Sequence, residues 1–169
     1  MKRILVLGAG LVAKPLVHYL MDKGHEVTVA SRTVSRAAKL VSGHPNGRAL
    51  ELDVQDERKL AELIRGCDLA VSLFPPQFHP VVARLCIAAR KNMVTTSYVS
   101  PAMQELDGPA KSAGVTVLNE IGVDPGGQAA QSGRLRQKAL PSRTRRAWYS
   151  LKRAVSGGSA SMKTSRSSS

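Results

Sequence analysis

The sequence contains few of the residues that bind metals or form disulfide bonds. It has two cysteines, Cys67 and Cys86, which form no C-x-x-C pair and match no zinc-binding spacing. We therefore expect both cysteines to be buried, unreactive thiols. The four histidines stand at His18, His25, His44 and His79. They are scattered, and the chain has no H-E-x-x-H motif, so the sequence predicts no metal site.

Long apolar runs are also missing, which argues against a membrane protein. No run approaches the roughly 18 apolar residues that are needed to cross a bilayer. Residues 1–7 combine a basic start with a short apolar stretch, as a signal peptide does. This stretch ends at Gly8 and no small-residue cleavage site follows it. We therefore expect a cytoplasmic protein.

Acidic residues are absent from the last quarter of the chain. Residues 1–126 hold 15 Lys/Arg and 12 Asp/Glu, whereas residues 127–169 hold 10 Lys/Arg and no acid. The net charge of +13 therefore belongs mostly to the end of the chain and does not indicate a nucleic-acid-binding surface on the first 126 residues. We predict a folded domain at 1–126 and a low-complexity basic tail at 127–169, disordered or helical only around 145–155.

Short apolar runs alternate with segments of helical periodicity across the first 126 residues. The expected strands are residues 4–7, 27–30, 49–52, 69–73, 93–96 and 115–118. The expected helices are residues 11–23, 35–41, 56–65, 79–90 and 101–113. Because the strands are continuously apolar, they are typical of a parallel sheet covered on both faces. The pattern predicts an α/β fold with a doubly wound parallel sheet of about six strands, a Rossmann fold.

A glycine-rich segment, G-A-G-L-V-A, joins the first expected strand to the first expected helix. Gly8 permits a tight turn, Gly10 lets the backbone approach a pyrophosphate, and Ala13 keeps the helix close to the sheet. Backbone N–H groups at the start of the helix would then bind the anion. A purely structural turn is the alternative. The predicted dinucleotide contacts here are Gly8, Ala9, Gly10, Leu11 and Val12.

The end of the second expected strand favours NADP(H) over NAD(H). Enzymes that bind NAD usually place a carboxylate there to accept hydrogen bonds from the ribose. This strand instead runs into Ser31, Arg32 and Thr33. An arginine can bind a 2′-phosphate through two hydrogen bonds, and the two hydroxyls can donate to it. The alternative is that Arg32 is only a solvated surface charge.

Polar or unusual residues also follow the other expected strands, where ligands of open α/β sheets bind. Asp53 and Val54 follow the third strand; Asp53 either contacts adenine or belongs to the turn before the next helix. Phe74 and two prolines follow the fourth strand, and residues 95–98 supply four consecutive hydroxyls after the fifth. Asp124 leads a D-P-G turn after the sixth strand. These positions predict a ligand site.

Together these segments resemble the glutamate-forming saccharopine dehydrogenases, or saccharopine reductases, of lysine metabolism. The resemblance covers residues 5–126 and begins with G-A-G-L-V-A-K-P at 8–15, V-T-V-A-S-R-T at 27–33 and L-D-V at 52–54. Its most distinctive segments are S-L-F-P-P-Q-F-H at 72–79, V-T-T-S-Y-V-S-P-A-M at 94–103 and N-E-I-G-V-D-P-G at 119–126.

The resemblance implies a reaction and a set of contacts. Glutamate condenses with aminoadipate semialdehyde, and NADPH reduces the imine to saccharopine. The implied cofactor contacts are Ala9, Gly10, Leu11, Val12, Ser31, Arg32, Thr33, Asp53, Val54, Phe74, Thr96, Ser97, Val123, Asp124 and Pro125. Substrate contacts are implied for Ser97 and Tyr98. Tyr98 and Asp124 are the candidates for polarising the substrate or relaying a proton.

The chain departs from this family after residue 126. The family continues into a long substrate domain, whereas residues 127–131, G-Q-A-A-Q, begin an unrelated segment. We therefore expect a truncated or frame-shifted product that binds NADP(H) but lacks its substrate domain and is inactive alone. The alternative is a non-catalytic NADP-sensing protein whose tail binds nucleic acid or an acidic partner, because Trp148 and Tyr149 stand among arginines.

Overall fold

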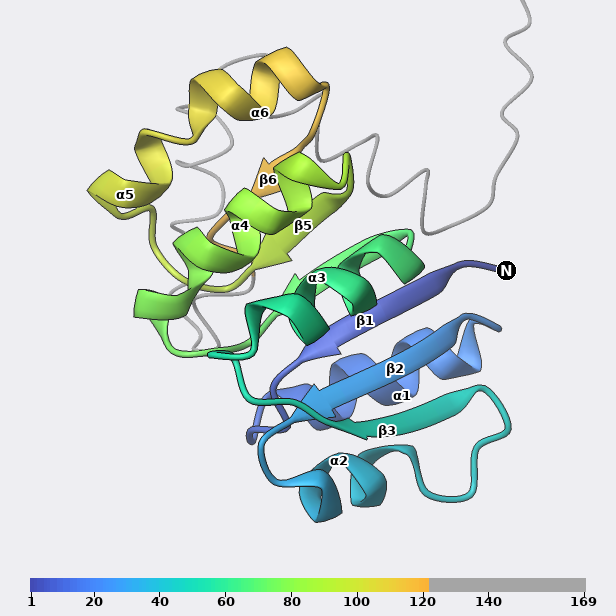
Figure 1. The fold of residues 1–169 in the computed structure, drawn as a ribbon. Helices are drawn as coiled ribbons and strands as arrows, with labels where there is room; N and C mark the ends of the chain where they lie inside the picture. Colours follow the sequence, from blue (N-terminus) through green and yellow to red (C-terminus); the bar gives the residue numbers. More distant parts are fainter. Residues whose placement is uncertain (122–169) are drawn as a thin grey trace, which may run out of the picture. The chain divides into compact units, whose positions relative to one another are not determined.

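The computed structural model describes residues 1–121 (Figure 1). The predicted boundary at 126 and the predictions for the tail lie outside these residues. The strands are β1 (Arg3–Leu7), β2 (Glu26–Ser31), β3 (Gly47–Glu51), β4 (Leu69–Ser72), β5 (Asn92–Thr95) and β6 (Val117–Leu118). The helices are α1 (Ala13–Asp22), α2 (Val34–Val41), α3 (Glu57–Gly66), η1 (Pro76–Phe78), α4 (His79–Ala88), α5 (Pro101–Gln104) and α6 (Asp107–Ala113).

The six strands form one parallel sheet in the order β3-β2-β1-β4-β5-β6. This is the strand order of a doubly wound dinucleotide-binding fold, so the predicted fold class is confirmed. Helices α1 and α2 contact each other and strand β2, while α3 and α4 pack together on the opposite face (Figure 1). The direction of winding reverses between β1 and β4, which is where such folds bind their ligands.

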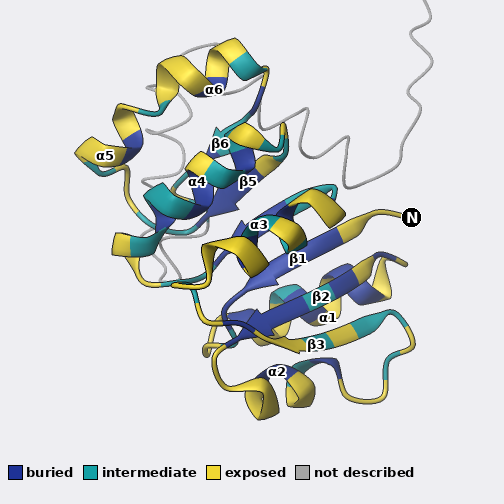
Figure 2. Ribbon diagram, viewed as in Figure 1, coloured by how far each residue is buried: buried dark blue, intermediate teal, exposed yellow. Residues whose placement is uncertain are grey.

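The core lies on both faces of the central strands, as their apolar sequences predicted. Ile4, Leu5, Val6 and Leu7 of β1 are all at most 2% exposed. Figure 2 shows buried residues along β1, β2 and β5, with exposed residues on the outer sides of the helices. A strand that is buried on both faces needs apolar side chains at consecutive positions, because neighbouring side chains point to opposite faces.

Two predicted boundaries near the end of the described chain were wrong. The expected helix at 101–113 is divided into α5 and α6. Pro109 explains the break, because proline has no N–H to bond to the carbonyl four residues earlier and its ring would clash with that carbonyl. The expected strand at 115–118 is shortened to Val117–Leu118, since the N–H of Val115 donates to the carbonyl of Ala110 and closes the end of α6.

Both cysteines are buried, as the sequence predicted. Cys67 is 4% exposed and Cys86 is fully buried. Burial raises the pKa of the Cys67 thiol to about 11 and that of Cys86 to about 12. Both side chains are therefore neutral thiols at physiological pH, and thiols are poor nucleophiles compared with thiolates.

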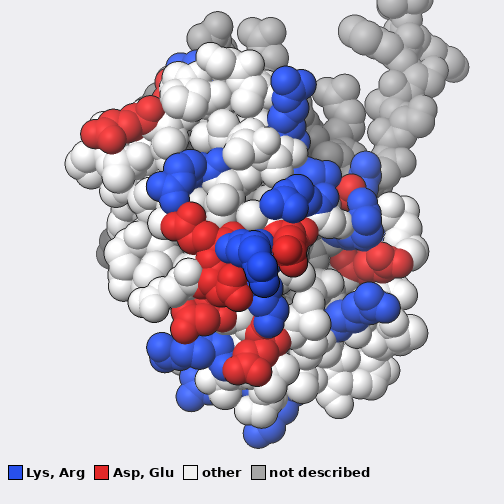
Figure 3. All heavy atoms as spheres, viewed as in Figure 1, with Lys and Arg blue, Asp and Glu red and all other residues white. Residues whose placement is uncertain are grey.

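The described surface carries charges of both signs. On the face shown in Figure 3, Lys and Arg side chains alternate with Asp and Glu side chains. Arg84 of α4 pairs with Glu57 of α3 at 3.0 Å, which joins the two helices on this face. A surface of mixed sign of this kind does not form a phosphate-binding stripe. Among residues 1–121, no helix combines the length and the apolarity that a membrane span requires.

Candidate dinucleotide site

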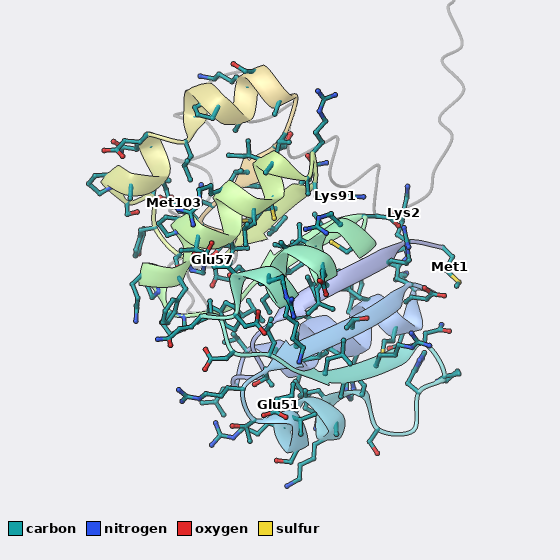
Figure 4. All side chains as sticks on the ribbon, viewed as in Figure 1. Met1, Lys2, Glu51, Glu57, Lys91 and Met103 are labelled. Atoms are coloured by element: carbon teal, nitrogen blue, oxygen red, sulfur yellow. The ribbon has the colours of Figure 1, made fainter. Side chains whose placement is uncertain are left out.

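The candidate site lies where the parallel strands end, which we call the carboxyl edge of the sheet. Figure 4 shows Glu51, the last residue of β3, at this edge, and Met1 and Lys2 at the opposite end of the strands. Leu7 is in register with Ala30 on one side and with Ser72 on the other. The loops that follow β1, β2 and β4 therefore begin side by side, although their sequences are far apart.

Gly8 makes the turn that follows β1. Its φ is +110°, a conformation that residues with a Cβ rarely adopt, and its N–H donates to the carbonyl of Ala30 at 2.8 Å. A Cβ on Gly8 would lie 3.1 Å from the carbonyl oxygen of Leu73. Gly8 is therefore required by the backbone itself. A Cβ on Gly10, in contrast, would meet no atom within 4 Å. The fold does not require a glycine at this exposed position.

The start of α1 is open to an anion. Ala13, the first helical residue, is fully buried, and its N–H donates to the carbonyl of Gly10 at 3.1 Å. Val12 precedes the helix and supplies no side-chain cap, and the first turn carries no acidic residue. Leu11 is fully exposed and Val12 is 63% exposed. Uncapped N–H groups at a helix start, with the positive end of its dipole, are the features that bind phosphate.

The loop after β2 presents an arginine, Arg32, that has no ion-pair partner among residues 1–121. The Oγ atom of Ser31 accepts a hydrogen bond from the N–H of Thr33 at 3.3 Å, which shapes the loop around Arg32. Arg32 is exposed and forms no ion pair with a carboxylate of residues 1–121. It is therefore free to bind a phosphate. Sequence reasoning missed Glu51, an exposed carboxylate that β3 brings into register with Ser31. Only the register between two strands could have revealed it.

Asp53 takes part in the turn before α3. Its carboxylate accepts a hydrogen bond from the N–H of Gln55 at 3.0 Å, while Asp56 caps the helix by accepting from the N–H of Lys59 at 2.9 Å. These bonds support the turn interpretation that the sequence left open. The carboxylate is also exposed, and contact with adenine stays a prediction. Val54, the next residue, is half-buried against the core.

Phe74 stands at the end of β4, half-buried against the core. Its ring meets that of Phe78 edge to face, with 6.4 Å between the ring centroids. Two prolines and a glutamine separate these rings in the sequence, and the second proline begins the short helix η1. Packing therefore fixes the position of the Phe74 ring, which is the group predicted to contact the cofactor.

The structure brings together the last two distinctive sequence segments. The N–H of Ile121 donates to the carbonyl of Thr95 at 3.2 Å, and the N–H of Glu120 donates to that of Ser97 at 3.1 Å. Residues 119–121 therefore run beside the end of β5. Tyr98 is 65% exposed at this place, and Thr96 and Ser97 are half-buried. The predicted contacts Val123, Asp124 and Pro125 lie outside the described residues.

Sequence reasoning missed a buried histidine behind this site. His79 is 2% exposed at the start of α4. Its Nδ1 atom lies 2.9 Å from Oγ of Ser72, and its Nε2 atom lies 3.0 Å from Oγ1 of Thr95 and 2.8 Å from Oγ of Ser97. Burial lowers the pKa of the imidazole below its usual value. The position of His79 at the end of the S-L-F-P-P-Q-F-H segment was the available signal.

Comparison with known proteins identifies the domain. A family model described as the saccharopine dehydrogenase NADP binding domain matches residues 4–118. The chain belongs to this family. The resemblance drawn from the sequence is therefore confirmed, and so is NADP as the cofactor of this NADP-binding domain.

Relatives of this NADP-binding domain are much longer than the present chain. Saccharopine dehydrogenase [NADP(+), L-glutamate-forming] of Pyricularia oryzae is 49% identical over 125 residues, which are 74% of this chain and 28% of that protein. The mitochondrial alpha-aminoadipic semialdehyde synthase of Bos taurus is 42% identical over 127 residues, 74% of this chain and 14% of that protein. The chain thus spans less than a third of the length of these relatives.

Solved structures agree with this assignment. The apo form of the L-Glu-forming saccharopine dehydrogenase of Saccharomyces cerevisiae superposes with a TM-score of 0.73 at 38% identity, covering 82% of this chain and 31% of that one. A shikimate 5-dehydrogenase of Mycobacterium fortuitum superposes with a TM-score of 0.55 at 23% identity, covering 70% of this chain and 44% of that one. The second likeness shows only the shared fold.

Proposed function

We propose that the chain is the NADP(H)-binding part of a glutamate-forming saccharopine dehydrogenase, which reduces the imine of glutamate and aminoadipate semialdehyde to saccharopine. The observation that carries the proposal is the carboxyl edge itself. An uncapped helix start after Gly8 and Gly10 lies next to the β2 loop, whose Arg32 forms no ion pair within residues 1–121. The glutamate-forming, NADP-dependent activity is the one named for the relative that is 49% identical.

In this proposal, different groups of the described residues bind different parts of the cofactor. The backbone of residues 9–12 binds the pyrophosphate, because N–H groups at the start of α1 face outward without a cap. Arg32 binds the 2′-phosphate, assisted by Ser31 and Thr33. Asp53, Val54 and Phe74 line the adenine and ribose path, and Thr96 and Ser97 contact the nicotinamide end. Bound NADPH supplies the hydride that reduces the imine.

The substrate requires more than residues 1–121 offer. Saccharopine carries three carboxylates, which need cationic partners to hold them. Within the described chain, Arg32 is the one arginine at the carboxyl end of a strand, and the cofactor phosphate uses it. Ser97, Tyr98 and, beyond the described residues, Asp124 remain to touch the reacting end of the substrate. Placement of reactants contributes about 7–11 kcal/mol to catalysis. We therefore propose that this chain binds cofactor without turning over saccharopine.

Two measurements test the proposal. Calorimetric titration should show binding of NADPH that is tighter than binding of NADH. NADPH absorbance, followed with semialdehyde and glutamate present, should show no turnover approaching the ordinary range of about 1–10³ per second. Equal affinity for the two cofactors would contradict the assignment of Arg32, and rapid turnover would contradict the assignment of the substrate to other residues.

The cellular location belongs to the same proposal. A cytoplasmic location is proposed for this chain, whereas the bovine relative is named as mitochondrial. Fractionation of cells that express a tagged full-length chain would separate the two locations. Recovery in the mitochondrial fraction would contradict the proposal.

A further inference from the structure

The hydroxyl groups around His79 form one connected network. Ser72 from β4 contacts one ring nitrogen, while Thr95 from β5 and Ser97 from the following loop contact the other. Ser72 and Thr95 are fully buried, and Ser97 is half-buried. Ser97 is therefore the member of the network through which His79 can act on a ligand at the carboxyl edge.

His79 is neutral in this environment. Burial lowers the pKa of the ring, and no carboxylate of residues 1–121 is hydrogen-bonded to it. A neutral imidazole has one N–H, which donates, and one bare nitrogen, which accepts. The direction of every hydrogen bond in the network then depends on which nitrogen carries the proton.

Both tautomers of the neutral ring keep Ser97 in contact with Nε2. With the proton on Nδ1, the ring donates to Ser72, and Nε2 accepts at its one lone pair. With the proton on Nε2, the ring donates toward Ser97 and Thr95, and the buried hydroxyl of Ser72 donates to Nδ1. The contact between Nε2 and Oγ of Ser97 is present in either case.

The histidine holds the side chain of Ser97. Its Oγ atom lies 2.8 Å from Nε2, closer than Oγ1 of Thr95 at 3.0 Å. The N–H of Glu120 donates to the Ser97 carbonyl and holds the backbone in place. Both the side chain and the backbone of Ser97 are therefore held by hydrogen bonds at the carboxyl edge.

We propose that His79 is a positioning residue that holds the Ser97 hydroxyl in place for a hydrogen bond with the nicotinamide end of the cofactor. The inference rests on the proposed function, because it requires NADP(H) at the carboxyl edge. His79 does not touch the ligand in this arrangement. It acts through Ser97, and removing its Nε2 atom leaves the Ser97 hydroxyl free to rotate.

Two substitutions of the histidine separate positioning from packing. In His79→Asn, the shorter amide can still donate to Ser72 but has no atom at the position of Nε2. In His79→Gln, the longer amide carries an oxygen toward Thr95 and Ser97. Dissociation constants of the full chain are measured for NADPH and for adenosine 2′,5′-bisphosphate, which lacks the nicotinamide half. His18→Asn, on the exposed side of α1, is the matched control.

We expect His79→Asn to weaken NADPH about two- to tenfold, the range of one hydrogen bond, and to leave the bisphosphate unchanged. His79→Gln should recover most of the affinity. Ser97→Ala should weaken NADPH equally, and adding His79→Asn to it should cause no further loss. If His79→Asn does not fold, His79→Gln is combined with Ser97→Ala instead. A double variant that binds NADPH more weakly than Ser97→Ala alone would overturn the proposal. Equal affinity of the two variants for NADPH would support it.

The outcomes distinguish this inference from the proposed function. If the unmodified chain binds neither NADPH nor the bisphosphate, both fail. If it binds both, and His79→Asn binds NADPH as tightly as the unmodified chain, the positioning role alone fails. A parallel loss of NADPH and bisphosphate in His79→Asn would also overturn it, because that result indicates a general loss of structure.

Discussion

Gly8 and Leu73 contact each other where the winding of the sheet reverses. A Cβ on Gly8 would lie 3.1 Å from the carbonyl oxygen of Leu73, a residue whose own N–H donates to the carbonyl of Leu7 at 2.8 Å. The loop after β4 is thereby held against the loop after β1. A side chain at Gly8 would therefore require the Leu73 carbonyl to shift by a few tenths of an ångström, in addition to the strain of the positive φ.

The two glycines of the loop should differ when each is replaced by alanine. We expect Gly8→Ala to lower the free energy of unfolding by about 1–3 kcal/mol, because it adds both a positive-φ strain and the contact with Leu73. Gly10→Ala should keep the stability within about 0.5 kcal/mol and weaken NADPH instead, because its new methyl occupies open space at the helix start. Urea unfolding and calorimetric titration measure the two effects. Equal destabilisation by both substitutions would contradict this division.

Arg32 should determine the preference between cofactors. We expect Arg32→Ala to cost NADPH about 1.5–3 kcal/mol, the value of a hydrogen bond to a charged group, and to leave NADH binding nearly unchanged. Arg58→Ala removes another exposed arginine, from α3, and serves as the control. A similar loss for both cofactors in Arg32→Ala would show that the side chain supports the loop rather than the 2′-phosphate.

His79 should make the fold sensitive to mild acid. Its folded pKa is lowered by burial, so below about pH 6.5 the unfolded chain takes up a proton that the folded chain resists. The free energy of unfolding is therefore highest above this pH and decreases as the pH falls toward the pKa of His79 in the folded chain. Urea midpoints measured between about pH 7 and about pH 5 should fall in the unmodified chain and fall less in His79→Gln. Identical slopes would refute this assignment.

The two buried thiols should resist modification. Because burial raises their pKa values to about 11 and about 12, Cys67 and Cys86 should not react with a disulfide reagent near neutral pH until the chain unfolds. Titration in urea should then release both thiols. Above about pH 9 the unfolded thiols ionise first, so stability should fall as the pH rises further. Rapid modification of the folded chain would show that one thiol is accessible.

Local patterns were sufficient for much of the fold. Consecutive apolar residues predicted β1, because a strand covered on both faces needs an apolar side chain at every position. Gly8 was predicted from its place between a strand and a helix, and its positive φ agrees. The division between α5 and α6 was missed, although Pro109 was visible, because the helical periodicity was continued across it. The ligand-binding roles predicted for Arg32, Ser97 and Tyr98 remain predictions, since no contact among residues 1–121 tests them.

The sequence by itself predicted most of the strands, the glycine turn, the NADP cofactor and the family, because each depends on residues that are neighbours in the chain. Tertiary structure decided what His79 contacts. Ser72, Thr95 and Ser97 lie 7, 16 and 18 positions away from it, and they meet around its ring because β4 and β5 pair in parallel at one register. The pairing of Glu51 with Ser31 has the same origin. Strand order and register arise from packing across the whole sheet, and no local pattern contains them.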